Sequence, residues 1–457
     1  MKIRRVLILG LGVTGLSVIR RFSGKAEMIG FDEGFERFSP DLRRKLLLRL
    51  SAVVTDRRLL PPRARAADLI VASPGIDLVA LGISRDNPRV VGDLDLAYAA
   101  RRVGRFLAVT GTNGKTTTTK LLAAIVMEHF GKSRVVVAGN IGTPLLDEVG
   151  KKSGLYYVVE LSSFQLELSK QFRPAVGLFL NLSQNHLDRH KTMTNYFEAK
   201  ARMFRRQTPA DTAVVNIDDP YGSRLARRLA SGPCRLIEYG VEPERHAVRN
   251  GLTLEGDRVV RRRNGVSRPL FDVPDPLFGP GKHNQSNLLA ASAAALAVGV
   301  PIPKILSAVR KFRLPAHRLE FVKKVDEVAY YDDSKATSVD AARKALQSFP
   351  SRQIIALMGG QDKGMDFTPL FRELTRQRNL KYLVFFGSLG DKFGRLAGRF
   401  RLPYKRVNRV ADAVRASRDA AAPGDIVVLS PGGTSFDQYT NYAERGRDFR
   451  ICVERLK

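Results

Sequence analysis

The stretch FLAVTGTNGKT, residues 106–116, decides the fold, because an apolar strand-like run enters a glycine loop and KLLAAIVMEHF, residues 120–130, continues as an apolar-rich helix. Glycines let backbone N–H groups turn toward phosphate oxygens, and the N-terminus of a helix adds partial positive charge. Lys115 can then bind the β- and γ-phosphates of a nucleotide, and the Thr116 hydroxyl can hold Mg²⁺. The stretch predicts an α/β nucleotide-binding domain; the alternative is a plain glycine turn before a helix.

This loop is shorter than the common G-x4-G-K-[ST] phosphate loop, since Val109 stands where that pattern has its first glycine. We expect the bound nucleotide to be ATP. The residues expected to contact ATP in this loop are Gly111, Thr112, Asn113, Gly114, Lys115, Thr116 and Thr117.

A second glycine loop, GLGVTG at residues 10–15, follows the apolar run VLILG and precedes the helical pattern LSVIRRF. Asp32 ends the next strand-like run, near the spacing of an acid that binds ribose. Taken alone, these features suggest a dinucleotide enzyme such as a nicotinamide dehydrogenase. The same physics binds any nucleotide diphosphate at a helix N-terminus, and the separate ATP loop makes a UDP-bearing substrate the favoured occupant.

The chain has 457 residues, and a single core rarely grows beyond about 250–300 residues, so we expect two or three domains. Strands alternate with helices in three blocks, residues 1–95, 96–314 and 315–457, which implies parallel sheets with helices on their faces. We predict a Rossmann-like first domain, a central P-loop-type mononucleotide-binding domain and a Rossmann-like C-terminal domain. The run RRRNGVSR, residues 261–268, is predicted to be a hairpin tip, and the N-terminal apolar run a first β-strand rather than a signal peptide.

The chain is strongly basic, with 76 Lys and Arg against 45 Asp and Glu, a net charge of +31. Attraction to nucleic acid would explain this charge, but the basic residues are spread along the chain, so a nucleotide-dependent nucleic-acid-binding protein is the less favoured alternative. Cys234 and Cys452 form no C-x-x-C pair, which argues against a zinc site or a disulfide framework and fits a reducing cytoplasm. No apolar run reaches about 18 residues, so we expect no membrane span. We predict a cytoplasmic monomer.

Nine motifs along almost the whole chain occur in the order seen in Mur ligases, and the chain resembles that family. They are GTNGKT, SPGI from Ser73, AGNIGTPLL from Ala138, ELSSFQLE from Glu160, NHLDRH from Asn185, GKHNQSN from Gly281, AHRLE from Ala316, DDSKATS from Asp332 and LSPGGTSFDQY from Leu429. The first glycine loop and the last two motifs are most similar to the members that add D-glutamate to UDP-N-acetylmuramoyl-L-alanine. The resemblance implies an ATP-dependent amide ligase of peptidoglycan synthesis that works through an acyl phosphate; another amino acid, such as L-glutamate, is the alternative.

The resemblance also implies roles for single residues. Lys115, Glu160, His186 and Lys200 match catalytic positions, and two Mg²⁺ ions would be held by Thr116, Glu160, His186 and, if it is carbamylated, Lys200. Without the motif, His186 would be interpreted as a satisfied buried histidine and Lys200 as an exposed helix lysine. Further ATP contacts are expected from Asn284, Asn287, Arg318, Asp333 and Lys335. Their alternatives are helix capping for the two asparagines and a surface ion pair for Arg318.

Two ligand sets complete the expected site. UDP-substrate contacts are expected from Val13, Thr14, Asp32, Ser73, Gly75, Asn140, Ser162 and His186. D-Glutamate contacts are expected from Thr337, Lys363, Ser435 and Phe436, although turn chemistry in a glycine-rich loop would also explain Ser435. The third block is expected to close over ATP and exclude water.

Three positions depart from the family pattern: Gly34 stands where relatives often have Arg, Gln361 where Asp is frequent, and Tyr442 where Phe is common. The segment from Asp86 to Arg89, DNPR, spells the signature of diaminopimelate-adding ligases. That signature belongs in the third block, so we predict that the segment in the first block is a loop or turn.

Overall fold

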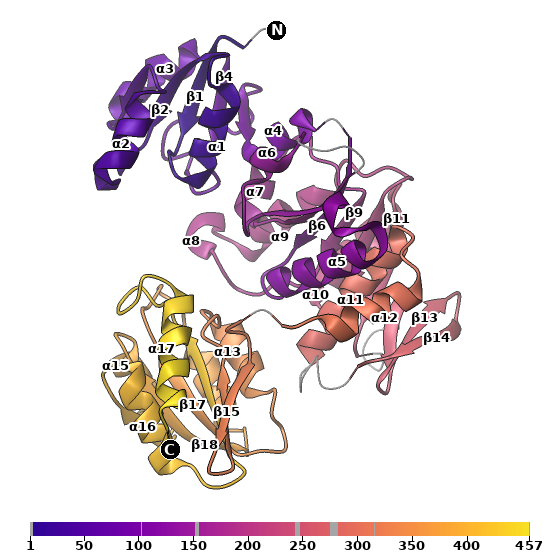
Figure 1. Cartoon of the computed structure of the whole chain (residues 1–457), viewed down its shortest axis with the longest axis vertical. Coiled ribbons are helices and arrows are strands. Elements are labelled where there is room, and N and C mark those ends of the chain that lie inside the picture. Colours follow the sequence, from indigo (N-terminus) through magenta and orange to yellow (C-terminus); the bar gives the residue numbers. More distant parts are fainter. Residues whose placement is uncertain are drawn as a thin grey trace. The chain divides into compact units, whose positions relative to one another are not determined.

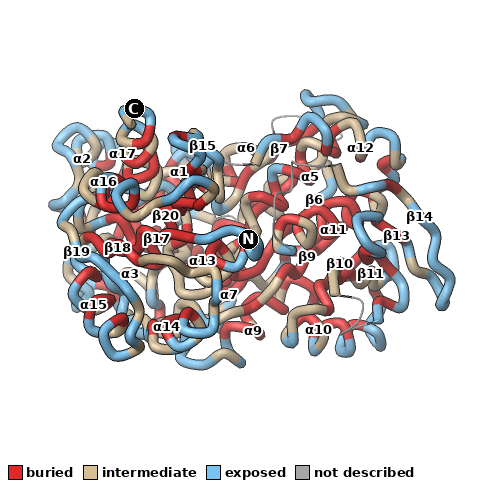
Figure 2. Tube along the Cα trace, turned by 90° about the horizontal axis from the view of Figure 1, so that it is seen from below, coloured by how far each residue is buried: buried red, intermediate tan, exposed pale blue. Residues whose placement is uncertain are grey.

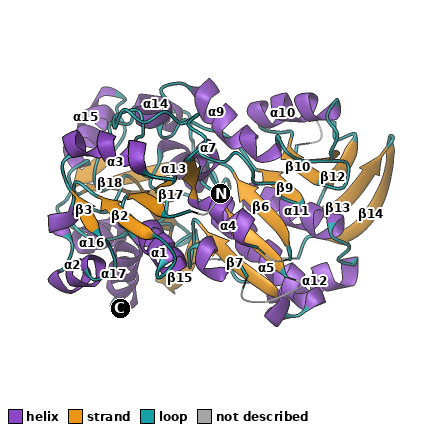
Figure 3. Ribbon diagram, turned by 90° about the horizontal axis from the view of Figure 1, so that it is seen from above, coloured by secondary structure: helices purple, strands orange, loops and turns teal. Residues whose placement is uncertain are grey.

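The computed structural model describes residues 3–101, 103–150, 155–242, 247–274, 282–314 and 316–456. These residues form three β-sheets with helices packed along them (Figures 1 and 3). Most strands are parallel and have helices on both faces, which explains why their sequences are near-continuous apolar runs rather than alternating ones. The predicted α/β class is confirmed.

The first sheet has the strand order β3-β2-β1-β4-β5 and is parallel throughout. Its strands are β1 Arg5–Leu9, β2 Glu27–Phe31, β3 Ala52–Val54, β4 Leu69–Ala72 and β5 Val90–Gly92. Its helices are α1 Val13–Phe22, α2 Pro40–Leu47, α3 Leu60–Ala66 and α4 Asp93–Ala100. Strand order reverses at β1, where ligands of such sheets bind beyond the carboxyl ends. The N-terminal run is a strand, and DNPR lies in turns between β4 and β5, both as predicted.

The second sheet has nine strands in the order β14-β13-β12-β11-β10-β9-β6-β8-β7. They are β6 Arg105–Thr110, β7 Val135–Gly139, β8 Tyr156–Glu160, β9 Val176–Phe179, β10 Thr212–Asn216, β11 Arg235–Gly240, β12 Asn250–Glu255, β13 Arg258–Arg263 and β14 Val266–Asp272. The helices are α5 Lys115–Phe130, α6 Leu145–Glu148, α7 Ser163–Glu167, α8 Leu187–His190, α9 Met193–Ala201, α10 Pro220–Ala230, α11 Lys282–Ala297 and α12 Ile302–Lys311. The last two strands form the predicted hairpin, whose tip turns at Asn264 and Gly265 with positive φ angles of 51° and 79°.

The third sheet has the order β15-β16-β20-β17-β18-β19. Its strands are β15 Glu320–Val325, β16 Val328–Asp332, β17 Ile354–Gly359, β18 Leu380–Phe386, β19 Tyr404–Arg406 and β20 Ile426–Gly432. Its helices are α13 Val339–Leu346, α14 Thr368–Leu374, α15 Gly390–Arg399, α16 Val410–Ala420 and α17 Tyr442–Glu454. Every residue of β17 and β20 is buried (Figure 2). One apolar cluster lies on each face of this sheet.

The chain divides into two compact units: residues 1–182, 186–273 and 286–311 form unit 1, and residues 183–185, 274–285 and 312–457 form unit 2. The first and second sheets therefore lie in unit 1 and the third sheet in unit 2. Within unit 1, the buried Asp95 carboxylate accepts hydrogen bonds from the backbone of Lys170, Gln171 and Phe172. The three-domain boundaries at residues 95 and 314 remain predictions. No helix in the described part of the chain is long and apolar enough to cross a bilayer.

Candidate active site

The GTNGKT loop joins the carboxyl end of β6 to the N-terminus of α5. Gly114 caps α5 in the left-handed conformation, with φ +80°. Asn181, just after β9, fastens the loop: its Oδ1 accepts from the Asn113 backbone N–H at 2.8 Å, and its Nδ2 donates to the Asn113 carbonyl at 3.1 Å. Sequence reasoning missed Asn181, because its role depends on β9 lying beside β6.

The Lys115 ammonium lies over its own loop, where Nζ donates to the carbonyls of Gly111 at 3.0 Å and Thr112 at 2.7 Å. A cation held at the N-terminus of a helix suits phosphate oxygens, which gain from both charges. This geometry supports the anion-binding function predicted for the loop.

Glu160 ends β8 and is 2% exposed. Its Oε2 accepts a hydrogen bond from Thr116 Oγ1 at 2.8 Å, and its Oε1 accepts one from Asn140 Nδ2 at 2.9 Å. One carboxylate thus joins the hydroxyl of the predicted ATP loop to a predicted UDP-substrate contact. A carboxylate and a hydroxyl offer the oxygen ligands that Mg²⁺ prefers, so this donor set fits the ion that the sequence predicts.

Lys200, on α9, is 1% exposed, which rules out the interpretation of an exposed helix lysine. Its Nζ donates to the Gly111 carbonyl at 2.9 Å and lies 4.9 Å from the centroid of the Tyr196 ring. Burial, and secondarily repulsion from Lys115, hold the pKa of Lys200 well below its usual range. These surroundings therefore disfavour the charged ammonium form of Lys200.

His186 caps α8 in the left-handed conformation, with φ 54°, and is partly exposed. The buried histidine of the same motif is His190, whose Nε2 lies 2.9 Å from Ser163 Oγ. Its ring stacks between Phe164 and Tyr196, with centroid distances of 5.4 and 5.0 Å. The satisfied buried histidine of NHLDRH is therefore His190, whereas His186 is partly exposed and lies edge-on to Phe164, with the ring centroids 4.9 Å apart.

The first glycine loop follows β1, and Asp32 fastens it. The Asp32 carboxylate accepts from the backbone N–H groups of Leu11 and Gly34, both at 2.9 Å, and Ser73 Oγ donates to the Gly10 carbonyl at 3.0 Å. A Cβ on Gly15 would lie 2.2 Å from the Gly10 carbonyl oxygen, so any side chain there would push helix α1 away from the loop.

The remaining predicted UDP-substrate residues also lie at strand and helix ends of unit 1. Val13, the first residue of α1, is 67% exposed, Thr14 is partly buried beside it, and Gly75 is exposed after β4. Ser162 caps α7 through a bond from the Gln165 N–H at 3.2 Å. Ser162 therefore has a structural role whether or not it contacts a ligand.

Asn284 and Asn287 both lie near the start of α11, and both are buried. Asn287 Oδ1 accepts a hydrogen bond from Thr118 Oγ1 on α5 at 3.1 Å. Asn287 also lies so close to the ATP loop that a Cβ on Gly114 would be 2.4 Å from its Oδ1. Asn287 therefore sits beside the loop expected to bind phosphates.

In unit 2, Asp333 follows β16 and accepts hydrogen bonds from Ser430 Oγ at 3.2 Å and the Leu319 N–H at 3.3 Å. Burial raises the pKa of Asp333 to about 8, although the positive charge of Arg318 acts in the opposite direction. Lys335 Nζ lies 3.7 Å from the ring centroid of Tyr442, a cation–π contact. Tyrosine in place of the common phenylalanine keeps that contact.

The residues predicted for D-glutamate come from loops after β16, β17 and β20, which are neighbouring parallel strands. Gln361 and Thr434 pair as an antiparallel bridge, with N···O distances of 2.7 and 3.1 Å, so Lys363 and Ser435 belong to paired loops. Lys363 is exposed, Ser435 is buried, Phe436 is 65% exposed and Thr337 is partly buried. An accessible cation beside hydroxyl-bearing loops suits an amino-acid dicarboxylate.

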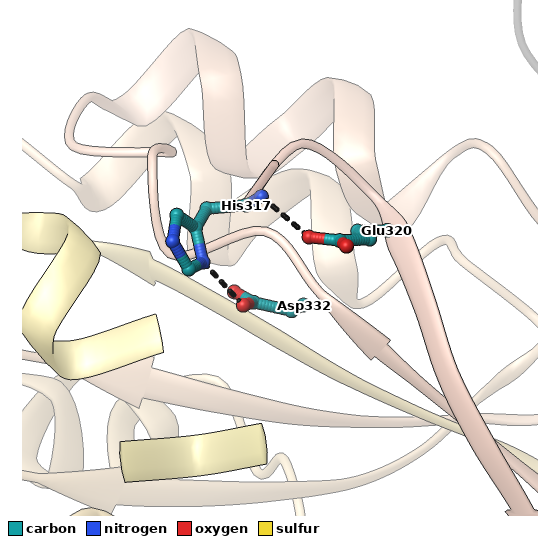
Figure 4. Close-up of side chains that lie close together, drawn as sticks. All are labelled: His317, Glu320 and Asp332. Carbon is teal, nitrogen blue, oxygen red and sulfur yellow. Dashed lines mark hydrogen bonds and ion pairs between the residues drawn. The ribbon is translucent and has the colours of Figure 1, made fainter. Parts of the chain in front are cut away.

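His317, Glu320 and Asp332 lie close together in unit 2 (Figure 4). His317 Nδ1 and Asp332 Oδ2 are 2.6 Å apart, and the His317 backbone N–H donates to Glu320 Oε2 at 2.9 Å. Tetrahedral metal ligands about 2.0 Å from an ion lie about 3.3 Å from one another, so the shorter separation marks a hydrogen bond rather than a metal site. This pair directly precedes Arg318 and Asp333 in sequence.

Two family models match the chain. Residues 109–295 match the Mur ligase middle domain, and residues 317–433 match the Mur ligase, glutamate ligase domain. The UDP-N-acetylmuramoylalanine–D-glutamate ligase of Pelotomaculum thermopropionicum is 39% identical, covering 99% of this chain and 98% of its own. The ligase of that name from Acidobacterium capsulatum is 36% identical, covering 99% and 96%.

Solved structures show the same fold at lower identity. The UDP-N-acetylmuramate-alanine ligase of Thermotoga maritima has a TM-score of 0.56 at 18% identity, covering 98% of this chain and 99% of its own. MurF from Acinetobacter baumannii has a TM-score of 0.61 at 17% identity, covering 98% and 94%.

Proposed function

This chain belongs to the Mur ligase family, and from that premise we propose that it joins D-glutamate to UDP-N-acetylmuramoyl-L-alanine at the expense of ATP, a step of peptidoglycan synthesis. The structural observation that carries the proposal is Glu160, whose carboxylate bonds to Thr116 of the phosphate loop and to Asn140. This contact ties the loop for ATP to a residue assigned to the nucleotide substrate, whose carboxylate must meet the γ-phosphate. The substrates are small molecules, and we propose that a single chain acts alone in the cytoplasm, where ATP is supplied.

In the first step, the terminal carboxylate of the UDP substrate attacks the γ-phosphorus of ATP, giving an acyl phosphate and ADP. Lys115 and the N–H groups at the start of α5 offset the repulsion between two anions. Thr116 and Glu160 would hold Mg²⁺, which supplies further neutralisation of phosphate charge when bound. We propose two ions, with Glu160, His186 and, once carbamylated, Lys200 contributing to the second.

In the second step, the amine of D-glutamate attacks the acyl carbon, and phosphate leaves from the tetrahedral intermediate. Lys363 would pair with one carboxylate of D-glutamate, while the hydroxyls of Thr337 and Ser435 would bind the other, and Phe436 would cover the aliphatic part. These contacts would place the amine, so catalysis rests on positioning and no protein nucleophile is needed.

Carbamylation of Lys200 fits its surroundings. A buried ammonium beside Lys115 is disfavoured, whereas an anionic carbamate would face the Lys115 cation and could accept hydrogen bonds. The modification would turn a buried cation into an oxygen donor able to support Mg²⁺.

The proposal is tested by phosphate release from the purified chain with ATP, Mg²⁺ and UDP-N-acetylmuramoyl-L-alanine, using D-glutamate, L-glutamate, L-alanine or glycine as acceptor. We expect release with D-glutamate, lost by at least about 10²-fold in Lys115→Ala. Lys120→Ala, an exposed residue of the same helix, is the matched control and should keep wild-type activity. Equal rates with L-glutamate, or full activity of Lys115→Ala, would contradict the proposal.

A further inference from the structure

Arg445 on α17 is fully buried, with 0% of its surface exposed. Its guanidinium makes five hydrogen bonds within unit 2 and all are to neutral oxygens. Nε donates to Ser334 Oγ at 3.0 Å and Nη2 to the Ser334 carbonyl at 2.9 Å. Nη1 donates to the carbonyls of Gly433 at 3.2 Å and Thr434 at 3.1 Å, and Nη2 also reaches Gly433 at 3.2 Å.

Each of the two segments that Arg445 joins carries predicted ligand contacts of unit 2. Ser334 stands between Asp333 and Lys335, which are assigned to ATP. Gly433 and Thr434 directly precede Ser435, which is assigned to D-glutamate. The segments follow β16 and β20, which are parallel neighbours, so one side chain fixes the spacing between their loops.

The next residue of α17 serves a third segment. A Cβ on Gly446 would lie 2.2 Å from His317 Nδ1 and 2.8 Å from Asp332 Oδ2, so only glycine lets the helix pack against that hydrogen-bonded pair. His317 has a positive φ of 63° and directly precedes Arg318. Consecutive residues of one helix therefore support the loops of Arg318, Asp333 and Ser435.

We propose that Arg445 is a positioning residue that holds the ATP-side loop at Ser334 and the amino-acid-side loop at Gly433–Thr434 at a fixed separation. The inference rests on the proposed function. Arginine suits the task because its planar fork presents five N–H donors in fixed directions, whereas lysine has three donors on one nitrogen and cannot bridge both loops in this way. A buried cation contributes little to stability by itself, so its value here is geometric.

The test compares Arg445→Lys with Arg447→Ala, an exposed arginine two residues further along the helix, in the full-length chain. KM is measured for D-glutamate, ATP and UDP-N-acetylmuramoyl-L-alanine, together with kcat. We expect Arg445→Lys to raise KM for D-glutamate at least tenfold and KM for ATP severalfold. KM for the UDP substrate should stay within twofold, because its predicted contacts belong to unit 1. Arg447→Ala should match the wild type.

Gly446→Ala provides a second variant, since its added methyl group meets His317 rather than the Gly433–Thr434 loop. It should raise KM for ATP more than KM for D-glutamate, the reverse of the order in Arg445→Lys. If Arg445→Lys does not fold, Arg445→Ala takes its place. Guanidinium added to folded Arg445→Ala should lower its KM for D-glutamate, and the KM order expected of Gly446→Ala still tests the inference.

The inference is overturned if Arg445→Lys is folded with a wild-type KM for D-glutamate, or if kcat falls while all three KM values stay constant. The second result would indicate a smaller folded fraction and a merely structural role. Failure of the proposed function has a different signature, because the wild type would then release no phosphate with D-glutamate. The KM comparison would in that case use whichever acceptor of the panel is active.

Discussion

Gly114→Ala gives the sharpest test of the phosphate loop, because two features of the backbone and its surroundings oppose any side chain there. Gly114 has φ +80°, and its Cβ would lie 2.4 Å from Asn287 Oδ1. A left-handed conformation costs a non-glycine residue about 1–2 kcal/mol. Displacing Asn287 also breaks the bond from Thr118 Oγ1, worth about 1 kcal/mol. The free energy of unfolding should therefore fall by about 2–3 kcal/mol.

The same substitution should impair ATP binding, since the Gly114 N–H and Asn287 are both assigned to the nucleotide. We expect KM for ATP to rise more than about tenfold, the equivalent of about 1.4 kcal/mol. Urea unfolding gives the stability change, and phosphate release against ATP concentration gives KM. Gly398→Ala, an exposed position in helix α15 with no heavy atom within 4 Å of the added Cβ, is the control. It should stabilise by about 0.5–1 kcal/mol and leave KM unchanged.

A Gly114→Ala variant with stability within about 0.5 kcal/mol of wild type would refute the argument from φ and contact. A destabilised variant with an unchanged KM for ATP would refute the phosphate-binding role alone. The two readouts thus separate a structural glycine from a ligand-binding one.

Three further predictions concern charge. Glu160→Gln should lower phosphate release at least about 10²-fold and raise the Mg²⁺ concentration needed for half-maximal rate, measured by MgCl₂ titration; an unchanged Mg²⁺ requirement would contradict the metal role. The wild-type rate should fall in CO₂-depleted buffer and return with bicarbonate, whereas Lys200→Ala should be inactive and unaffected by bicarbonate; a wild-type rate independent of CO₂ would argue against carbamylation. Burial raises the pKa of Asp333 from 3.8 to about 8, so the folded chain retains a proton that the unfolded chain releases, and stability should fall as pH rises from 3.8 to about 8. Between pH 5 and pH 9, the melting temperature of Asp333→Asn should therefore fall less than that of the wild type. Equal falls would show that Asp333 does not titrate in this window.

Most of the strands could be predicted from the sequence, because the central strands of a parallel sheet are apolar on both faces. VLIL of β1 and IIALMG of β17 are such strands. The strands β5, β11, β15 and β19 were not predicted; β11 has the sequence RLIEYG and β15 the sequence EFVKKV. Strand β15 lies at a sheet edge, where two consecutive lysines interrupt the apolar pattern. Strand β11 mixes charged and aromatic residues that fit several structures.

The candidate site was predictable where motifs name a residue, but not where burial gives the residue its role. Lys200 has the sequence surroundings of an exposed helix lysine, and its burial follows from α9 packing under the loop at Gly111. Arg445 sits in the segment YAERGRDFR, where the sequence alone does not distinguish it from the exposed Arg447 of the same helix. Its partners Ser334 and Gly433 are 111 and 12 residues away, so only the tertiary fold brings the guanidinium to them.

In each sheet, a polar side chain that bonds to backbone groups helps to fasten the ligand loop. Asp32 holds the first glycine loop, Asn181 holds GTNGKT, and Arg445 holds the loops of the third sheet. Loops at the carboxyl ends of buried strands leave N–H and C=O groups that need partners, and an unmet buried group costs free energy. A side-chain carboxylate suits a loop whose backbone N–H groups point inward, because it accepts hydrogen bonds. An asparagine amide suits a loop that presents both N–H and C=O groups, and a guanidinium suits one in which carbonyls converge. Since an ionised carboxylate can accept about four hydrogen bonds, Asp32 can fasten its loop and still accept one from a ribose hydroxyl, so its two assigned roles are compatible.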